Sequence, residues 1–81
     1  MTSHEKVQEL RDWIEAHLAS LQELATLRSR LLQQAVDHPS PAVARALQIN
    51  RETADRVRRA SRLARAQLAD LQARETTSSG C

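Results

Sequence analysis

The stretch that decides the fold is His38-Pro39-Ser40-Pro41, near the middle of the 81-residue chain. A proline disfavours helical geometry in the residue before it, so His38 and Ser40 should both leave the α-helical region. The Ser40 hydroxyl can then cap a following helix, and Pro41 suits the first helical position, where its missing N–H is not needed. The two prolines therefore predict a sharp turn between two helices.

On both sides of this turn, apolar residues recur at steps of three and four, the spacing of one helix face. The stripe before the turn consists of Val7, Leu10, Ile14, Leu18, Leu21, Leu24 or Ala25, Leu31 or Leu32, and Val36. The stripe after the turn consists of Val43, Leu47, Asn50, Ala54, Val57, Ser61, Ala64, Leu68 and Leu71. The two stripes predict a pair of long helices that meet along one line.

The boundaries follow from the same signals. We expect residues 1–75 to form a single helical hairpin, with helices over about residues 3–36 and 41–74 and a turn at 37–41. Thr2 and Glu5 have capping-box spacing at the start of the first helix. Residues 76–81 are small, polar and aperiodic, which predicts a flexible tail. Cys81, the last residue of the sequence, should be exposed and unnecessary for folding.

Charge and register favour an antiparallel arrangement. Residues 1–38 carry six acidic and four basic side chains, a net charge of −2, and residues 39–81 carry four acidic and eight basic ones, a net charge of +4. Opposite charges should flank the line of contact, although each exposed pair contributes only tenths of a kcal/mol. Paired positions should have numbers that add to about 79, which places Arg28 opposite Asn50 as a polar layer.

Composition agrees with an all-α fold and excludes several function classes. The chain contains 13 Ala and 11 Leu, one aromatic residue, one Gly and one Cys. This balance favours helix over sheet, and the single Gly excludes Gly-rich phosphate-binding loops. One Cys excludes an intrachain disulfide and a cysteine-based zinc site. No two histidines have metal-ligand spacing, so we expect neither a metal nor another cofactor.

Nothing in the sequence predicts contact with a membrane. The first residues lack the apolar stretch of a signal peptide, and no uninterrupted apolar run exceeds three residues. We therefore expect a cytoplasmic protein, with export by a route that needs no cleaved signal left open.

Several large apolar residues lie outside the two stripes, where a two-helix hairpin does not cover them. They are Trp13, Leu27, Ile49 and Leu63. A chain this short also has a marginal core of its own. We expect these residues to bind a partner, so that the hairpin forms a homodimer or larger four-helix bundle, or wraps a helix of another protein.

The second helix is rich in arginine. Arg51, Arg58, Arg62 and Arg65 share one face and could follow the phosphates of RNA or DNA. The alternative is a solvated face, because Glu52–Arg56, Asp55–Arg59 and Asp70–Arg74 have the spacing of helical ion pairs. Lysine is nearly absent and this helix has no aromatic residue for base stacking. We favour the solvated face.

Around the turn the chain reads Pro39-Ser40-Pro41-Ala42-Val43, then Leu47 and Gln48, then Arg58, Ala60, Ala64, Gln67 and Asp70. This pattern resembles the turn and second helix of the needle subunits of type III secretion systems, which are hairpins of similar length. The polar residues 75–81 replace the apolar end by which needle subunits pack into a filament. The resemblance thus implies a helical-hairpin co-chaperone of such a system rather than the subunit itself.

A second pattern consists of Leu10, Arg11, Ile14, Leu21, Leu24, Arg28, Leu31, Arg51 and Glu52. It is similar to helical chorismate mutases, and the resemblance implies that Arg11 and Arg28 bind substrate carboxylates while Glu52 contacts the ether oxygen. The chain lacks the third helix of that family, and the family's active-site lysine would fall near Pro39. We expect a non-catalytic interaction module, as an adaptor, a secretion chaperone or a structural subunit, with the mutase and the nucleic-acid binder as alternatives.

Overall fold

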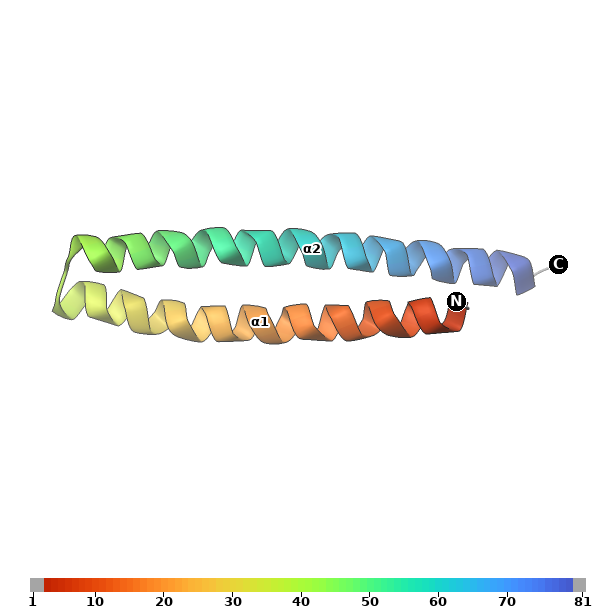
Figure 1. Ribbon diagram of the computed structural model, residues 1–81, viewed down its shortest axis with the longest axis horizontal. Coiled ribbons are helices and arrows are strands. Elements are labelled where there is room, and N and C mark those ends of the chain that lie inside the picture. The colour runs from red at the N-terminus through yellow and green to blue at the C-terminus, as the bar shows by residue number, and fades with distance from the viewer. Residues whose placement is uncertain (1–2, 80–81) are drawn as a thin grey trace.

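The computed structural model describes residues 3–79, which form two long helices, α1 (Ser3–Asp37) and α2 (Pro41–Ser79). The helices run antiparallel and lie side by side from the turn onward, so that α1 begins and α2 ends at the same end of the molecule (Figure 1). The predicted all-α antiparallel hairpin is confirmed. The predictions for Thr2 and Cys81 concern residues outside the described part of the chain.

The turn forms as its local sequence predicts. The backbone N–H of His38 donates to the carbonyl of Gln34 at 2.7 Å, which completes the last turn of α1. The Ser40 hydroxyl accepts a hydrogen bond from the N–H of Val43 at 3.2 Å, and the Ser40 carbonyl accepts one from Ala44 at 3.1 Å. Ser40 is therefore the N-cap of α2, with Pro41 at the first helical position.

The second helix is longer than predicted. We expected it to end near residue 74, but α2 continues to Ser79. Between Pro41 and Gly80 the sequence contains neither proline nor glycine, so no residue in this stretch breaks the helix. The low helix propensity of serine and threonine is a weaker effect than a breaker, and it does not end α2.

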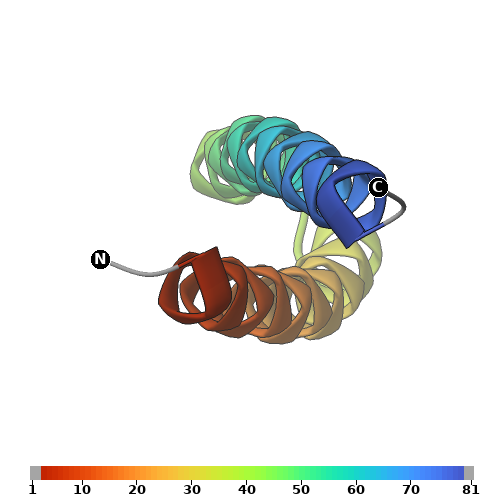
Figure 2. The same ribbon diagram turned by 90° about the vertical axis from the view of Figure 1, so that its right-hand side faces the viewer.

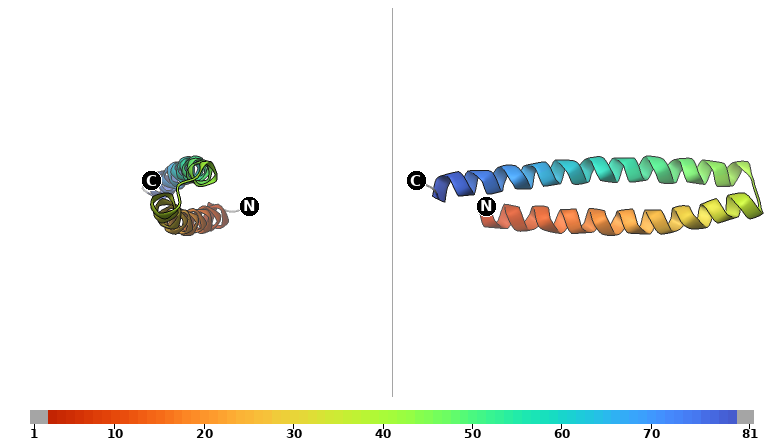
Figure 3. Two further views of the ribbon diagram at one scale, coloured as in Figure 1. Left: turned by 90° about the vertical axis from the view of Figure 1, so that its left-hand side faces the viewer. Right: turned by 180° about the vertical axis from the view of Figure 1, so that it is seen from behind.

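The two helices meet along one line of contact, here called the seam. From α1 the seam takes Val7, Leu10, Ile14, His17, Leu21, Leu24 and Leu31, and from α2 it takes all nine predicted stripe residues, Val43 to Leu71. These positions alternate steps of three and four, a repeat of 3.5 residues that lets two helices stay in contact by winding around each other. Figure 2 shows the inclined helix axes, and in both views of Figure 3 the helices remain side by side.

The predicted α1 stripe is wrong at four positions. Leu18, Ala25, Leu32 and Val36 are exposed, and Val36 retains 77% of its accessible area. These residues lie one position beyond the 3.5-residue repeat, so the winding of the helices carries them out of the contact. Conversely, His17 lies in the seam although its polarity excluded it from the stripe.

The predicted polar layer also differs from the structure. Asn50 is buried, but its amide Nδ2 donates to the main-chain carbonyl of Leu24 at 3.0 Å, not to anything near Arg28. Arg28 is exposed. Its seam position is compatible with exposure because a long side chain can carry its charge out to water. The partner of Asn50 thus lies one helical turn earlier in α1 than predicted.

The hairpin is elongated and buries little. It measures 64 × 19 × 14 Å, with a radius of gyration of 18.4 Å, where a compact chain of this length would have about 12 Å. Its accessible surface is 6413 Å², compared with about 4,900 Å² for a compact monomer of the same mass. The buried apolar residues of the described part are Val7, Leu10, Ala54 and Ala64.

The cap of α2 can be tested directly. Changing Ser40 to Ala should lower the free energy of unfolding by about 1 kcal/mol, because the N–H of Val43 loses its acceptor. Urea titration followed by circular dichroism, at one fixed protein concentration, measures the change. Ser40→Asp is the matched control and should retain the wild-type value, since a carboxylate also caps. An equal loss in both variants would contradict the capping role.

Candidate interaction surfaces

The seam is narrow, and on each side of it a flank of the hairpin stays open. Residues that immediately precede seam positions lie on one flank in both helices, and residues that immediately follow them lie on the other. The first flank carries the predicted partner-binding residues Trp13, Leu27, Ile49 and Leu63, and we call it the apolar flank. The second carries Arg51, Arg58, Arg62 and Arg65, and we call it the arginine flank.

A shallow groove of about 330 Å³ lies on the apolar flank, between Trp13 of α1 and Leu63 of α2. Leu10, His17, Ala60, Ala64 and the stems of Lys6, Glu9 and Gln67 complete its walls. The indole of Trp13 packs against the His17 ring, with centroids 5.4 Å apart and planes inclined by 57°. The groove thus offers a mostly apolar floor with polar groups at its rim.

The four large side chains of the apolar flank remain substantially in water. Their exposed fractions are 57% for Trp13, 46% for Leu27, 54% for Ile49 and 67% for Leu63. Leu27 follows Trp13 by 14 residues along α1, and Leu63 follows Ile49 by 14 residues along α2. Between these anchors the flank carries small residues, among them Ala16, Ser20, Thr53 and Ala60. The sequence prediction that these four residues share a surface is consistent with their placement.

His17 is a feature of the site that the sequence prediction missed. It lies in the seam three residues after Ile14 and four before Leu21, and its Nδ1 atom is buried without a hydrogen-bond partner among the described residues. The heptad spacing was the available signal, but the polar side chain argued against a seam position. A buried ring nitrogen without a partner weakens the contact between the helices.

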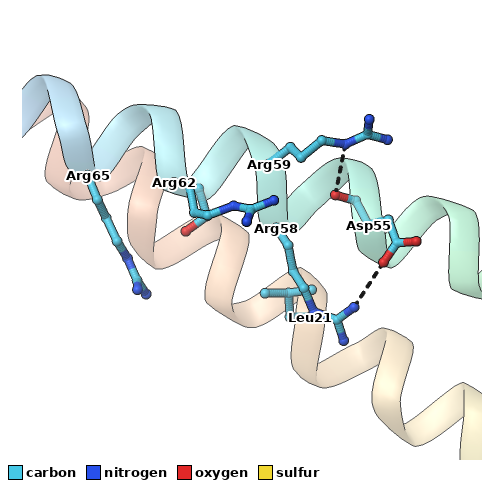
Figure 4. A pocket seen from close by; sticks show the side chains of 7 residues that line it. Leu21, Asp55, Arg58, Arg59, Arg62 and Arg65 are labelled. Atoms are coloured by element: carbon cyan, nitrogen blue, oxygen red, sulfur yellow. Dashed lines mark hydrogen bonds and ion pairs between the residues drawn. The ribbon is translucent and has the colours of Figure 1, made fainter.

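A second groove, of about 490 Å³, opens on the arginine flank. Leu21 and Ser61 lie at its base, and Asp55, Arg58, Arg59, Arg62 and Arg65 line it (Figure 4). In this view the Arg58 side chain passes close to Leu21 of α1, and Arg65 extends from α2 toward α1. The groove is wide, positively charged and open to water.

The ion pairs of the arginine flank differ in part from those predicted. Arg74 and Asp70 pair at 3.1 Å as expected. Asp55 instead pairs with Arg58 at 3.2 Å, and Arg59 donates from Nε to the main-chain carbonyl of Asp55 at 3.4 Å. All ion pairs between described residues join neighbours in one helix, so the expected opposite charges across the seam form no direct contacts.

The third predicted pair is replaced as well. Glu52 accepts a hydrogen bond from the amide of Gln48 at 3.3 Å, and Arg56 has no acidic partner in the described part of the chain. Side chains this exposed exchange partners at little energetic cost, which is why spacing alone does not determine the pairing.

The residues implied by the mutase resemblance do not form one site in the hairpin. Arg11 and Arg28 are 17 residues apart on α1, a distance of about 25 Å along the helix axis. Arg28 borders a small depression of about 80 Å³ with Arg51 and Arg58. Glu52 lies outside this depression and is hydrogen-bonded to Gln48.

Two further properties concern the described residues, 3–79. They hold no group of three side chains that could ligate a metal ion. Neither helix in this range is apolar enough over sufficient length to cross a membrane. No protein-family model, curated protein or solved structure matches the chain. The resemblances to secretion hairpins and to chorismate mutases therefore stay predictions.

The unpaired nitrogen of His17 leads to a stability prediction. Changing His17 to Leu should raise the free energy of unfolding by about 1–2 kcal/mol, because an apolar side chain replaces a buried polar atom without a partner. The matched control is His4→Leu at an exposed position of α1, which should change stability by less than about 0.5 kcal/mol. Denaturant unfolding at fixed protein concentration gives both values. Destabilisation by His17→Leu would show that the ring makes a favourable contact that leucine cannot replace.

Proposed function

We propose that this hairpin is a non-catalytic protein-interaction module, which associates through its apolar flank with a second copy of itself or with a helix of another protein. The observation that carries the proposal is the alignment of Trp13, Leu27, Ile49 and Leu63 on one flank, each about half exposed or more. Helices commonly recognise each other through such rows of apolar anchors. An adaptor, a secretion chaperone or a structural subunit in the cytoplasm would each use this surface.

The energy of burial supports the same proposal. Complete burial of one large apolar side chain contributes about 1.5–3 kcal/mol, and roughly half of that contribution is unused at each of the four anchors. Together these residues leave several kcal/mol unused, in a fold whose total stability is of the order of 5–15 kcal/mol. Association that covers the flank would therefore change the stability of the hairpin substantially.

The exposed area is also of the right size. The hairpin exposes 6413 Å², about 1,500 Å² more than expected for a compact monomer of its mass. A specific interface of ordinary size removes about 800 Å² from each partner. One interface over the apolar flank would thus remove about half of the excess.

The proposal is tested by removing two anchors. The double variant Trp13→Ala, Leu63→Ala should raise the dissociation constant of the self-associated form about 100-fold, since each truncation removes an exposed apolar anchor. Sedimentation velocity over a range of concentrations measures it.

The matched control is Leu18→Ala, Leu32→Ala, which truncates two leucines of similar exposure on the opposite flank. This variant should associate like the wild type. The wild-type thermal midpoint should also rise with protein concentration. A wild-type chain that sediments as a monomer, with a concentration-independent midpoint, would contradict self-association.

The arginine flank supports a second function, the binding of nucleic-acid phosphates. Residues 51–65 contain six arginines and two acidic residues, and Arg62 and Arg65 have no acidic partner within residues 3–79. Rows of guanidinium groups along a helix can follow a phosphate backbone. The lack of an aromatic residue on α2 argues for contacts to phosphate and against base stacking.

Salt dependence tests this second function. If Arg62 and Arg65 contact duplex phosphates, changing both to Gln should reduce the slope of log K against log salt concentration by about 0.9 for each lost contact. Arg45→Gln, at an exposed position outside both grooves, is the control and should retain the wild-type slope. Fluorescence anisotropy with a short labelled duplex measures the slopes. Equal slopes in all three proteins, or no binding at low salt, would exclude phosphate binding by this flank.

A further inference from the structure

We infer that the occupant of the apolar flank is a second copy of this chain, in a two-fold symmetric four-helix bundle where α1 of each copy packs on α2 of the other and both turns lie at the same end. The inference rests on the proposed function and specifies its partner and geometry. Its basis is the spacing of the anchors, their level along the hairpin, and the charge of the two helices.

The anchors of the flank match each other in spacing. Trp13 and Leu27 are 14 residues apart on α1, and Ile49 and Leu63 are 14 residues apart on α2, which is about 21 Å on each helix. Trp13 and Leu63 line one groove, so they lie at the same level of the hairpin. Leu27 and Ile49 then share a second level, two heptads closer to the turn. A partner for this flank needs anchors with the same repeat, and the flank itself has them.

A two-fold axis can place this flank on itself in two ways that keep neighbouring helices antiparallel. With the axis along the hairpin, both turns lie at one end and α1 packs on α2 of the second copy. Trp13 then meets Leu63 of the second copy, and Leu27 meets its Ile49. With the axis across the hairpin, the turns lie at opposite ends and each helix packs on its own equivalent. Both arrangements bury all four anchors, so apolar contact alone does not decide between them.

Charge decides for the first arrangement. The half of the chain that contains α1 carries a net charge of −2, and the half that contains α2 carries +4. Packing α1 on α2 of the second copy brings opposite charges together, whereas the alternative places like charges side by side on both helix pairs.

Individual side chains agree with the net charges. On the apolar flank, Lys6 and Asp70 lie at one level, because their numbers have the same total as those of Trp13 and Leu63. In the first arrangement they face each other between the two copies. In the second arrangement the axis passes near Arg56, which would face its own equivalent. A like-charge contact at that point is unfavourable.

Small residues between the anchors allow the two copies to approach closely. Ala16, Ser20, Thr53 and Ala60 occupy the flank between the levels of the large side chains. Alternation of large and small residues across facing positions is the pattern that fills a helical interface without voids. Because the same patch serves both copies, every favourable contact of the interface occurs twice.

A spin label near the turn distinguishes the arrangements. We would replace Cys81 with Ser, introduce a single cysteine by His38→Cys, and measure the label-to-label distance by pulsed dipolar spectroscopy in the full chain. His38 is exposed in the turn. Turns at the same end place the labels within about 30 Å, because neighbouring helix axes are about 8–10 Å apart. Turns at opposite ends place them about 50 Å apart, given 1.5 Å per residue.

The control label is Ala19→Cys, on the exposed outer face of α1 near the middle of the hairpin. It should give a distance below about 35 Å in either arrangement and so reports association alone. Short distances at both positions support the inference. A short distance at residue 19 with about 50 Å at residue 38 overturns it, while self-association in the proposed function stands. No dipolar coupling at either position, together with sedimentation as a monomer, overturns both.

Discussion

Two helices packed side by side shield only the side chains along the line where they meet, and the other features of this protein depend on that limit. One seam takes roughly two residues from every seven of each helix. The flanks next to it stay in water unless something else covers them. Trp13 and Leu63 are exposed for this geometric reason, although their chemistry would place them in a core.

Within the seam itself, polar residues limit the apolar contribution and add specificity. Asn50 and Ser61 are buried on α2, and His17 faces the seam from α1. The hydrogen bond from Asn50 to the Leu24 carbonyl joins one particular pair of levels, so sliding the helices would break it. A seam of leucines alone would be stronger but less selective for one register. The hairpin thus has a defined register and a weak core, a combination that favours further association.

The turn and the α2 stripe were predictable from sequence because each depends on local rules. Proline geometry and a serine cap act within four residues, and in α2 few apolar residues compete for the stripe. In α1, leucine is so frequent that Leu18 and Leu32 fit a helical period as well as the true seam does. Only the winding of one helix around the other separates them, and winding is a property of the pair. For the same reason, the partner of Asn50 was predicted one turn away from its actual position.

The candidate surfaces were predictable in composition but not in arrangement. The sequence shows that Trp13, Leu27, Ile49 and Leu63 exceed what one seam can bury, yet their common flank follows only once the seam is known. The ion pairs of the arginine flank were predicted with less success, because exposed side chains choose among partners of nearly equal energy.

The two flanks also constrain each other. If the apolar flanks of two copies meet, the arginine flanks lie on opposite outer faces of the bundle and stay open. Self-association would then present two separate arginine rows on one particle. Two linked sites bind an extended polyanion more tightly than either site alone, because the second contact becomes intramolecular. Association through Trp13 and Leu63 would therefore strengthen any phosphate binding by Arg62 and Arg65 without any contact between these two groups. The apolar flank is in this sense the primary surface, and the arginine flank depends on it.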